Sequence, residues 1–416
     1  ELNLEQAQAI EVWRGPASAV LGGNALHGAI NVISPVPQRT SLGIEVGNYD
    51  FARVNAAGGF TRGDHTVGAS IVGTTTNGYR DSTGYGQQKA SLAHLTEVSG
   101  WAVKNQFTAT LLNQETGAYV RGLEAYEDPD LRSSNPNPEA FRDAWSMRAS
   151  SEWTKDQWTL KPYLRRSQMT FLQHFLPGQP LENNDQTSGG LIVDYAIDAG
   201  ATKANVGGQV ELMSGALNEF QDGPTVGSAF LVATRPAGLH YDYEVDSYLV
   251  AGFYSLQHSL SDGLRVLHSL RLEYLDYDYT NNHIVGNTKD DGTPCGFGGC
   301  LYSRPESRTD SFTNIGARLG VEKDLSAGLL YASVSSGFRP PQVTELYRLR
   351  GGQTVADLDS ERLTAFEAGF KNDAVAVAAF VERTRDFLFR DADAFNVSDG
   401  RTRSAGVAFR GHHAIG

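Results

Sequence analysis

Short segments of alternating apolar and polar residues limit what this chain can fold into more than any other feature. They follow one another from Ser41 onward, and a long example runs from Leu264 to Tyr274. Alternate side chains of a β-strand point to opposite faces, so this segment has one apolar face, formed by Leu264, Val266, Leu270, Leu272 and Tyr274. The other face carries Arg265, Ser269, Arg271 and Glu273, and only Leu267 and His268 break the pattern. Charged side chains are costly to bury unpaired in a sandwich core but are solvated in a water-filled lumen, so the pattern predicts an all-β fold, an antiparallel transmembrane β-barrel.

Hydropathy agrees with strands and argues against membrane-spanning helices. The 416 residues are 40% hydrophobic, and no apolar run approaches the ~20 residues that such a helix needs. The low mean hydropathy of −0.33 is compatible with a barrel, because barrel strands carry apolar residues only at every second position. A chain of this length usually divides into two or three domains, but no linker or change of composition marks a division after residue 37.

The connections between the predicted strands alternate between short and long. The short ones lie at 62–64, 154–157, 261–263, 324–326 and 371–373, and the long ones at about 113–143, 168–187, 213–242, 278–308, 337–359 and 386–402. Outer-membrane barrels place their short turns on one rim and their long, extracellular loops on the other. This spacing predicts about 16 strands, an even number that also allows a closed, porin-sized barrel.

Charge and cysteine content narrow the classes of partner. The net charge of −13 argues against nucleic acid, which binds basic surfaces. Cys295 and Cys300 lie five residues apart among glycines, which predicts a small-loop disulfide in an oxidising compartment. A zinc site is the alternative, but it needs two more ligands, and His283 is the only nearby candidate. His412 and His413 form a weak metal-binding signal near the end of the chain.

A glycine-punctuated unit at residues 10–34 precedes the alternating segments. It reads IEVWRGPASAVLGGNALHGAINVIS, which predicts a strand, a turn, one or two helical turns and a second strand, Ile30 to Ile33. The unit resembles the end of the plug domain of TonB-dependent outer-membrane receptors, with a pattern close to IEVxRGPxSxLYGxxAxGGxINxIT. Leu21-Gly22-Gly23 stands where the family usually has Leu-Tyr-Gly, and His27-Gly28 where it has Gly-Gly. A βαβ fragment of a soluble protein is the alternative reading.

The same resemblance returns near the other end of the chain. SSGFRPPQVTELY at 335–347 resembles the strand and loop opening GFRxP, and DLDSERLTAFEAGFKND at 357–373 resembles the strand that follows it. The resemblance implies that residues 1–36 are the C-terminal part of a luminal plug and that 37–416 are a partial barrel. Family barrels have about 22 strands, so we expect several final strands and the first part of the plug to be missing.

The resemblance also implies plug-to-wall contacts. Plug arginines of this family pair with glutamates of the barrel wall, and Arg14 and Glu367 stand on the matching motif positions. The alternation of Glu361–Lys371 turns Glu367 into the lumen, opposite Phe366 and Phe370. We therefore expect Glu11, Arg14 and Glu367 at the contact, with Arg14 and Glu367 at salt-bridge distance. The alternative is an Arg14 that is merely solvated in the lumen.

Aromatic and charged residues of the long loops suit a bulky anionic or aromatic chelate, through stacking and charge. The expected set is Tyr119, Arg121, Tyr126, Phe171, His174, Phe175, Tyr241 and Tyr243. For each of them alone a structural role is the favoured reading, since Tyr and Phe near strand ends form the interfacial aromatic girdle of a barrel, so the expectation applies to the set. Haem receptors of the family carry a histidine between their FRAP and NPNL motifs. Residues 338–360 contain none, which favours a siderophore over haem.

The resemblance implies a function in transport across the bacterial outer membrane. We expect uptake of a scarce metal chelate, chiefly a ferric siderophore, with no cofactor of the protein's own. The expected partners are TonB with its inner-membrane energising complex, the chelate, and outer-membrane lipid, but not nucleic acid. Cobalamin, haem and copper remain alternative ligands, and a passive porin-like channel remains an alternative function. A barrel-borne surface enzyme is disfavoured, because no GxSxG, HExxH or phosphate-loop motif is present.

Overall fold

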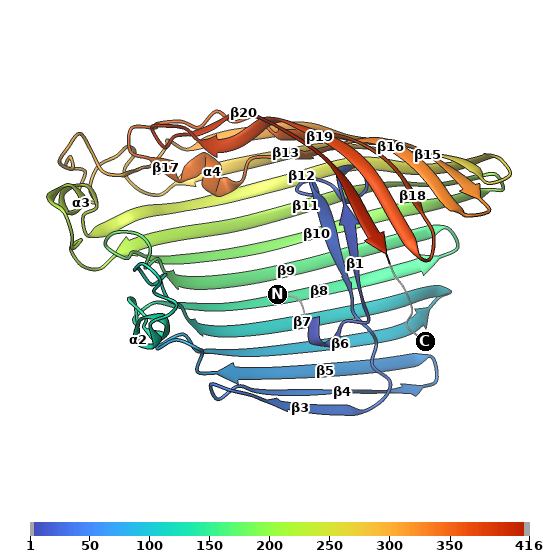
Figure 1. Ribbon diagram of the computed structural model, residues 1–416, viewed down its shortest axis with the longest axis horizontal. Helices are drawn as coiled ribbons and strands as arrows, with labels where there is room; N and C mark the ends of the chain where they lie inside the picture. Colours follow the sequence, from blue (N-terminus) through green and yellow to red (C-terminus); the bar gives the residue numbers. More distant parts are fainter. Residues whose placement is uncertain (1–3, 412–416) are drawn as a thin grey trace.

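A computed structural model of the protein describes residues 4–411. One antiparallel sheet of 16 strands runs in chain order from β3 to β20, except that the small strands β14 and β17 pair apart from it. The β1–β2 hairpin forms a sheet of its own. The large sheet curves around this hairpin, with β3 and β20 at the two ends of the strand order (Figure 1). The predicted all-β class and the predicted number of strands are confirmed.

The bounds of the elements follow the chain. The first strands and helices are η1 Leu4–Gln6, β1 Ala9–Arg14, α1 Ser18–Leu21, β2 Gly28–Ile33, β3 Ser41–Val46, β4 Ala52–Arg62, β5 His65–Thr76, β6 Tyr85–Val98, β7 Trp101–Glu115, α2 Pro129–Ser133, β8 Phe141–Lys155 and β9 Trp158–Leu172. The later ones are β10 Leu181–Ala199, β11 Thr202–Gln221, α3 Ala229–Thr234, β12 Gly238–Ser261, β13 Leu264–Asn281, β14 Tyr302–Ser303, β15 Arg308–Leu325, β16 Gly328–Arg339, α4 Val343–Tyr347, β17 Leu349–Arg350, β18 Glu361–Lys371, β19 Val375–Arg390 and β20 Asn396–Gly411. None of the helices within residues 4–411 has the length and apolar character needed to cross a membrane.

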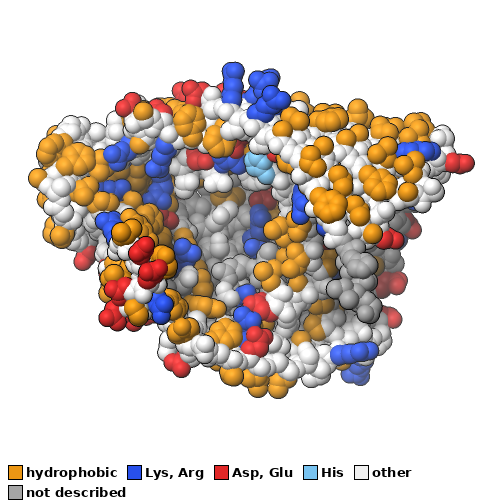
Figure 2. All heavy atoms as spheres, viewed as in Figure 1, with side chains coloured by type: hydrophobic (Ala, Val, Ile, Leu, Met, Phe, Trp, Pro, Cys, Tyr) orange, Lys and Arg blue, Asp and Glu red, His pale blue; other side chains and the backbone are white. Residues whose placement is uncertain are grey.

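The sheet is apolar outside and polar inside, the reverse of a soluble protein. On β13, Leu272 is 52% exposed, whereas Arg271 and Glu273 on the opposite face are 2% and 1% exposed. Figure 2 shows hydrophobic side chains over the outer surface near β18 and β19, and charged side chains inside the hollow. Strand alternation therefore sorts apolar side chains outward and charged ones inward, as the sequence predicts.

The two rims differ as predicted. Turns of two or three residues join strands on one rim, and the long connections with α2 and α3 lie on the other (Figure 1). The strands of the sheet extend to as many as 24 residues, in β12. The connection predicted at 213–242 is accordingly only 222–237. The reason is that polar strand ends continue the backbone ladder beyond the apolar band, where alternating hydropathy no longer marks them.

Candidate functional site

The plug segment consists of the β1–β2 hairpin with α1 between its strands. Arg14 pairs with Gly28 at the end of the hairpin, and a Cβ atom at Gly28 would lie 2.2 Å from the carbonyl oxygen of Trp13. Glycine at this position thus lets the two strands close. Helix α1 then reaches β12, β13, β15 and β16 of the wall.

Helix α1 sits on two glycines of the wall, Gly316 on β15 and Gly337 on β16. A Cβ atom at Gly316 would lie 2.9 Å from the backbone nitrogen of Ala19, and one at Gly337 would lie 3.0 Å from Ser18 Oγ. Ser18 Oγ accepts a hydrogen bond from the Phe338 amide at 3.1 Å and lies 3.4 Å from the Phe338 carbonyl oxygen. Ser18 itself is fully buried. We call Ser18, Gly316, Gly337 and Phe338 the plug seat.

The turn after α1 lies against a buried ion pair of the wall. Arg271 and Glu273 are joined at 2.7 Å, and the Gly23 amide donates to Glu273 Oε2 at 3.5 Å. A Cβ atom at Gly22, whose φ is +86°, would come within 3.0 Å of Arg271 Nη2. Gly22 stands where the family usually has tyrosine, and here its lack of a side chain allows the turn to approach the pair.

The expected pairing of Arg14 with Glu367 is not among the ion pairs of the part of the chain that the structure describes. Arg14 is exposed on the hairpin, and Glu367 accepts a hydrogen bond from the Tyr331 hydroxyl at 2.8 Å. Glu11 bonds Asn31 across the hairpin at 3.0 Å rather than the wall. Tyr331 on the neighbouring wall strand β16 is thus the partner of Glu367. A match to a family motif cannot reveal such a contact between strands.

A different ion pair joins the plug segment to the wall. Glu5 of η1 accepts from Lys89 Nζ of β6 at 3.1 Å, and the Lys89 side chain is only 9% exposed. Burial of Glu5 acts to raise the pKa of its carboxyl, but hydrogen bonds from the backbone and Lys89 outweigh it and lower that pKa. Sequence reasoning missed this pair, although an inward lysine on an otherwise uncharged stretch of β6 was a visible signal.

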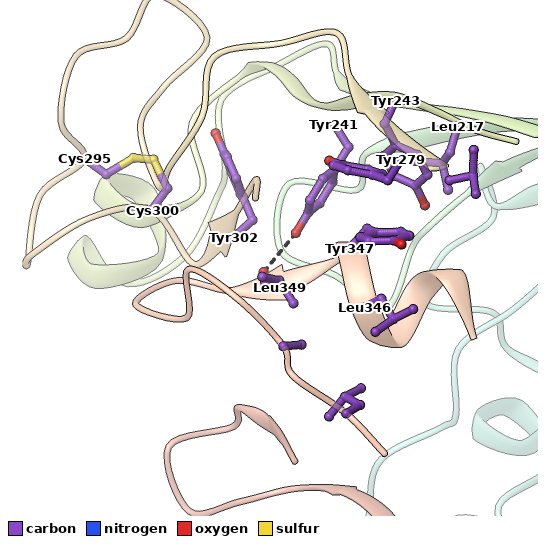
Figure 3. Close-up of a cluster of buried hydrophobic side chains, with 13 residues drawn as sticks. Leu217, Tyr241, Tyr243, Tyr279, Cys295, Cys300, Tyr302, Leu346, Tyr347 and Leu349 are labelled. Carbon is purple, nitrogen blue, oxygen red and sulfur yellow. Dashed lines mark hydrogen bonds between the residues drawn. A yellow bond between two sulfur atoms is a disulfide. The ribbon is translucent and has the colours of Figure 1, made fainter. Parts of the chain in front are cut away.

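Five tyrosines take part in a small core at the rim with the long connections, which we call the tyrosine core. Tyr279 stacks on Tyr347 of α4 with ring centroids 4.1 Å apart. Tyr241 donates from its hydroxyl to the Leu349 carbonyl at 3.0 Å, shown as a dashed line in Figure 3. Tyr243 is 3% exposed in the same cluster. The core fastens the connection between β16 and β18 onto β12 and β13.

A buried charge network lies beside this core. Arg348 donates to Glu182 at 2.7 Å and also to Glu219. Gln173 Nε2 donates to both carboxylates, at 2.8 and 3.1 Å. His240 Nδ1 lies 3.1 Å from Glu219. The network ties three strand ends to one arginine of the long connection after β16, so it holds that connection against the ends of the strands.

A pocket of about 490 Å³, which we call the arginine pocket, opens above this network. Four arginines line it, Arg235, Arg348, Arg350 and Arg390, against the two carboxylates Glu219 and Glu345. Within residues 4–411, neither Arg350 nor Arg390 has an ion-pair partner. Burial, with Arg235 and Arg390 nearby, lowers the pKa of the Arg350 guanidinium. The pocket therefore has an excess of positive charge that an anion would neutralise.

The structure divides the expected ligand-binding residues among four places. Tyr241 and Phe175 line the arginine pocket, while Tyr243 packs in the tyrosine core. Phe171, His174 and Phe175 form an aromatic cluster, with ring centroids 5.8 to 6.3 Å apart. Tyr119, Arg121 and Tyr126 lie on the exposed connection before α2, where Arg121 covers the Tyr119 ring. The arginines of the pocket were not predicted, because only folding brings these three distant parts of the chain together.

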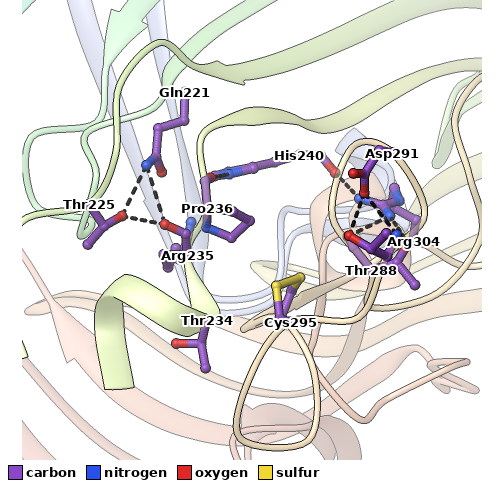
Figure 4. Close-up of a disulfide and its surroundings, with 12 residues drawn as sticks. Gln221, Thr225, Thr234, Arg235, Pro236, His240, Thr288, Asp291, Cys295 and Arg304 are labelled. Carbon is purple, nitrogen blue, oxygen red and sulfur yellow. Dashed lines mark hydrogen bonds between the residues drawn. A yellow bond between two sulfur atoms is a disulfide. The ribbon is translucent and has the colours of Figure 1, made fainter. Parts of the chain in front are cut away.

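The predicted disulfide between Cys295 and Cys300 is present and closes a loop on the same rim (Figure 4). Arg304, 1% exposed, holds the base of this connection. It donates to the His240 carbonyl at 3.1 Å and to the Thr288 carbonyl and hydroxyl at 2.9 Å. No cluster of three or more metal-ligating side chains occurs in the described part of the chain. His412 and His413 lie outside the described residues.

A curved wall that is apolar outside and charged inside, with a small hairpin seated in its hollow, defines a membrane β-barrel with a luminal plug segment. A family model described as "TonB dependent receptor-like, beta-barrel" matches residues 48–412, so the chain belongs to the TonB-dependent receptor β-barrel family. That family is one of receptors, not of enzymes. No curated protein sequence matches this chain.

Solved structures share the fold at low sequence identity. The siderophore receptor PiuA from Acinetobacter baumannii has a TM-score of 0.71 at 13% identity, over 98% of this chain and 67% of that one. The ferric-catecholate import receptor Fiu from K12 E. coli, in its closed form, has 0.70 at 14%, over 97% and 66%. The ferric citrate transporter FecA without ligand has 0.72 at 14%, over 98% and 61%. The chain thus spans about two thirds or less of the length of these structures.

Proposed function

We propose that this chain is part of a TonB-dependent receptor that imports an anionic metal chelate, chiefly a ferric siderophore, across a bacterial outer membrane. The observation that carries the proposal is the arginine pocket, in which Arg350 and Arg390 have no carboxylate partner in the described residues. Charge-assisted bonds to an anionic chelate would satisfy both guanidiniums. Aromatic side chains in the same lining, Phe175, Tyr241 and Tyr302, suit flat chelating groups.

The structures that resemble this one support the choice of ligand class. Two of them are named for ferric catecholate and ferric citrate, both of which are anionic iron complexes. The proposed energy source is TonB with its inner-membrane complex, acting on the plug. The contacts of the plug segment fit this role, since the hydrogen bond at the plug seat and the Glu5–Lys89 ion pair on β6 can be broken and remade.

Binding measurements on arginine variants test the pocket. We compare the protein with a double variant, Arg350→Gln with Arg390→Gln, against a ferric tris-catecholate, ferric citrate and uncharged cobalamin. Each lost charge-assisted bond weakens binding by about tenfold or more, so the anionic chelates should lose at least that factor. Arg132→Gln on α2 is the matched control, because it removes an exposed arginine from the same rim outside the pocket.

Uptake in cells with and without TonB tests the transport mechanism separately. Labelled iron should enter only with TonB present if the receptor proposal is right. Entry that is independent of TonB would instead support a passive channel. Tightest binding of cobalamin, haem or copper, with no effect of the arginine variants, would overturn the choice of ligand and leave the receptor class intact.

A further inference from the structure

A chain of hydrogen bonds crosses the outer face of β5–β8 close to the short-turn rim. Trp153 Nε1 donates to Ser151 Oγ at 2.7 Å, and Ser151 Oγ donates to Asn105 Oδ1 at 2.6 Å. The Asn105 amide nitrogen lies 3.4 Å from His94 Nδ1. His94 Nε2 lies 3.0 Å from His65 Nδ1. Five side chains from four neighbouring strands are thus linked in one direction.

The order of donors places the protons on the two histidines. Asn105 offers an N–H group to His94 Nδ1, so neutral His94 carries its proton on Nε2 and donates it to His65 Nδ1. His65 then carries its own proton on Nε2. Within residues 4–411 this Nε2 has no protein partner, and the His65 side chain is exposed. The chain therefore ends in a free donor, polarised by the bonds behind it.

A positive charge stands beside this donor. Arg62 is the cross-strand partner of His65, so both side chains lie on the same face of the sheet. Arg62 is exposed and takes part in none of the ion pairs found among the described residues. A guanidinium next to a polarised imidazole N–H is a suitable arrangement for a phosphate oxygen.

An apolar groove of about 480 Å³ continues from this polar group toward the middle of the sheet. One rung further along, Leu92, Phe107, Ala149 and Leu164 are paired in a row across β6–β9. The small side chain of Ala149 forms the bottom of the groove between the larger side chains of Phe107 and Leu164. The row faces outward, because Lys89, three residues before Leu92, points inward to Glu5.

Tryptophans mark the depth of this site. Trp101 begins β7, Trp158 begins β9 and Trp153 lies near the end of β8, all toward the short-turn rim. Tryptophan is enriched where a membrane protein meets the lipid headgroups. The free donor and Arg62 thus lie at headgroup level and the groove at acyl-chain level.

We propose that this outer face binds one phospholipid molecule. Its phosphate accepts bonds from Arg62 and His65, and one acyl chain lies in the groove over Ala149. The inference rests on the proposed membrane location but not on the imported ligand. It assigns His65 and His94, which have no place in the plug seat or the arginine pocket, to a lipid site on the periplasmic side of the barrel.

Native mass spectrometry of the detergent-purified protein tests this site. The probes are dioleoylphosphatidylglycerol and dioleoylglycerol, which have the same acyl chains with and without phosphate. We expect one phosphatidylglycerol molecule to remain bound and the double variant Arg62→Gln with His65→Leu to lower the bound fraction by about tenfold. Ala149→Leu, which fills the groove, should lower it as well while leaving the headgroup residues in place.

His258→Leu is the matched control. His258 is an outward, half-buried histidine at the same rim, and its Nδ1 is bonded to Thr202 Oγ1 at 2.7 Å rather than to a second histidine. Equal binding of dioleoylglycerol, or a double variant that binds like the unchanged protein, would overturn the proposal. TonB-dependent uptake should be unchanged in the double variant, so failure of the lipid site and failure of the transport proposal give different results. Heat-modifiable gel mobility shows that each variant forms its barrel.

Discussion

Replacing Gly316 with alanine should unseat the plug segment while leaving the barrel wall intact. The new Cβ atom would lie 2.9 Å from the Ala19 nitrogen and 3.0 Å from the Ser18 carbonyl carbon. Both are backbone atoms, which cannot rotate away as a flexible side chain can. Ordinary carbon contacts need about 3.5 Å, so helix α1 must move by roughly 0.5 Å.

The size of the effect follows from what this movement breaks. The Phe338 amide bonds Ser18 Oγ at 3.1 Å, and a shift of that size carries the bond beyond hydrogen-bonding distance. The lost bond costs about 1 kcal/mol, and the crowding costs about 1–3 kcal/mol. The opening free energy of the plug segment should therefore fall by about 2–4 kcal/mol. Since 1.4 kcal/mol is a factor of ten, amides of residues 16–24 should exchange about 30-fold faster or more.

Hydrogen exchange measured by mass spectrometry follows the plug and the wall in one experiment. Gly320→Ala is the control, because Gly320 lies on the same face of β15 and its Cβ would meet nothing closer than 3.6 Å. Exchange in β15 and β16 should stay slow in both variants. The reasoning fails if Gly316→Ala exchanges like the unchanged protein in residues 16–24, or if Gly320→Ala accelerates them equally.

Two further changes test the rim and the plug contact. Cys295→Ser with Cys300→Ser opens a loop with a sequence separation of five. The disulfide's loop-closure contribution to stability is about 2 kcal/mol for so small a ring. Proteolysis within 286–304 should therefore accelerate in this variant while the other connections stay resistant. Glu5→Gln removes a carboxyl whose pKa is lowered from its ordinary value of 4.5 in the folded protein. That carboxylate stabilises the folded plug above about pH 4.5 and loses this contribution as the pH falls through its lowered pKa. The opening free energy of the η1 region, obtained from hydrogen exchange after dividing out the intrinsic exchange rate at each pH, should therefore fall on acidification in the unchanged protein and be less pH-dependent in Glu5→Gln.

The barrel wall is readable from the sequence because its rule is local. Side chains alternate with a period of two wherever a strand runs, so Arg271 and Glu273 face inward and Leu272 outward whatever strand pairs with β13. Turn residues such as Gly263 mark the short rim for the same local reason. The wall and its rims can therefore be predicted from residues that are close in the chain. Only the strand ends are not predicted, because they are polar on both faces.

The sites depend on residues that are distant in the chain. Ser18 meets Phe338 across 320 positions, and the arginine pocket takes Arg235 and Arg390 from distant parts of the chain. Tyr241 and Tyr243 show the limit of reasoning by residue type. Both were expected to bind ligand and both pack in the tyrosine core, but only Tyr241 also lines the pocket. Composition of a loop indicates that recognition is possible there, but folding decides which side chains face the ligand.

Double-mutant cycles on the plug contacts separate the pair inferred from the motif from the pair seen in the structure. Glu5→Gln with Lys89→Met should show a coupling free energy of about 1–2 kcal/mol, because the two side chains meet at 3.1 Å and are 20% and 9% exposed. Arg14→Ala with Glu367→Gln should be additive within about 0.5 kcal/mol, since Arg14 is exposed and Glu367 is bonded to Tyr331.

The readout for both cycles is the hydrogen-exchange opening free energy of residues 4–34. A coupling above about 1 kcal/mol for Arg14 and Glu367 would mean that the plug also occupies a second position, turned so that β1 faces β18. Additive effects for Arg14 and Glu367, together with coupling between Glu5 and Lys89, would show that the ion pair holding the plug segment lies on β6. Because β6 and the plug seat on β15 and β16 lie far apart in the strand order, the segment is then held at two distant points of the wall. Release of one point lets the segment pivot about the other, so the segment can leave the wall in two smaller steps instead of breaking every contact at once.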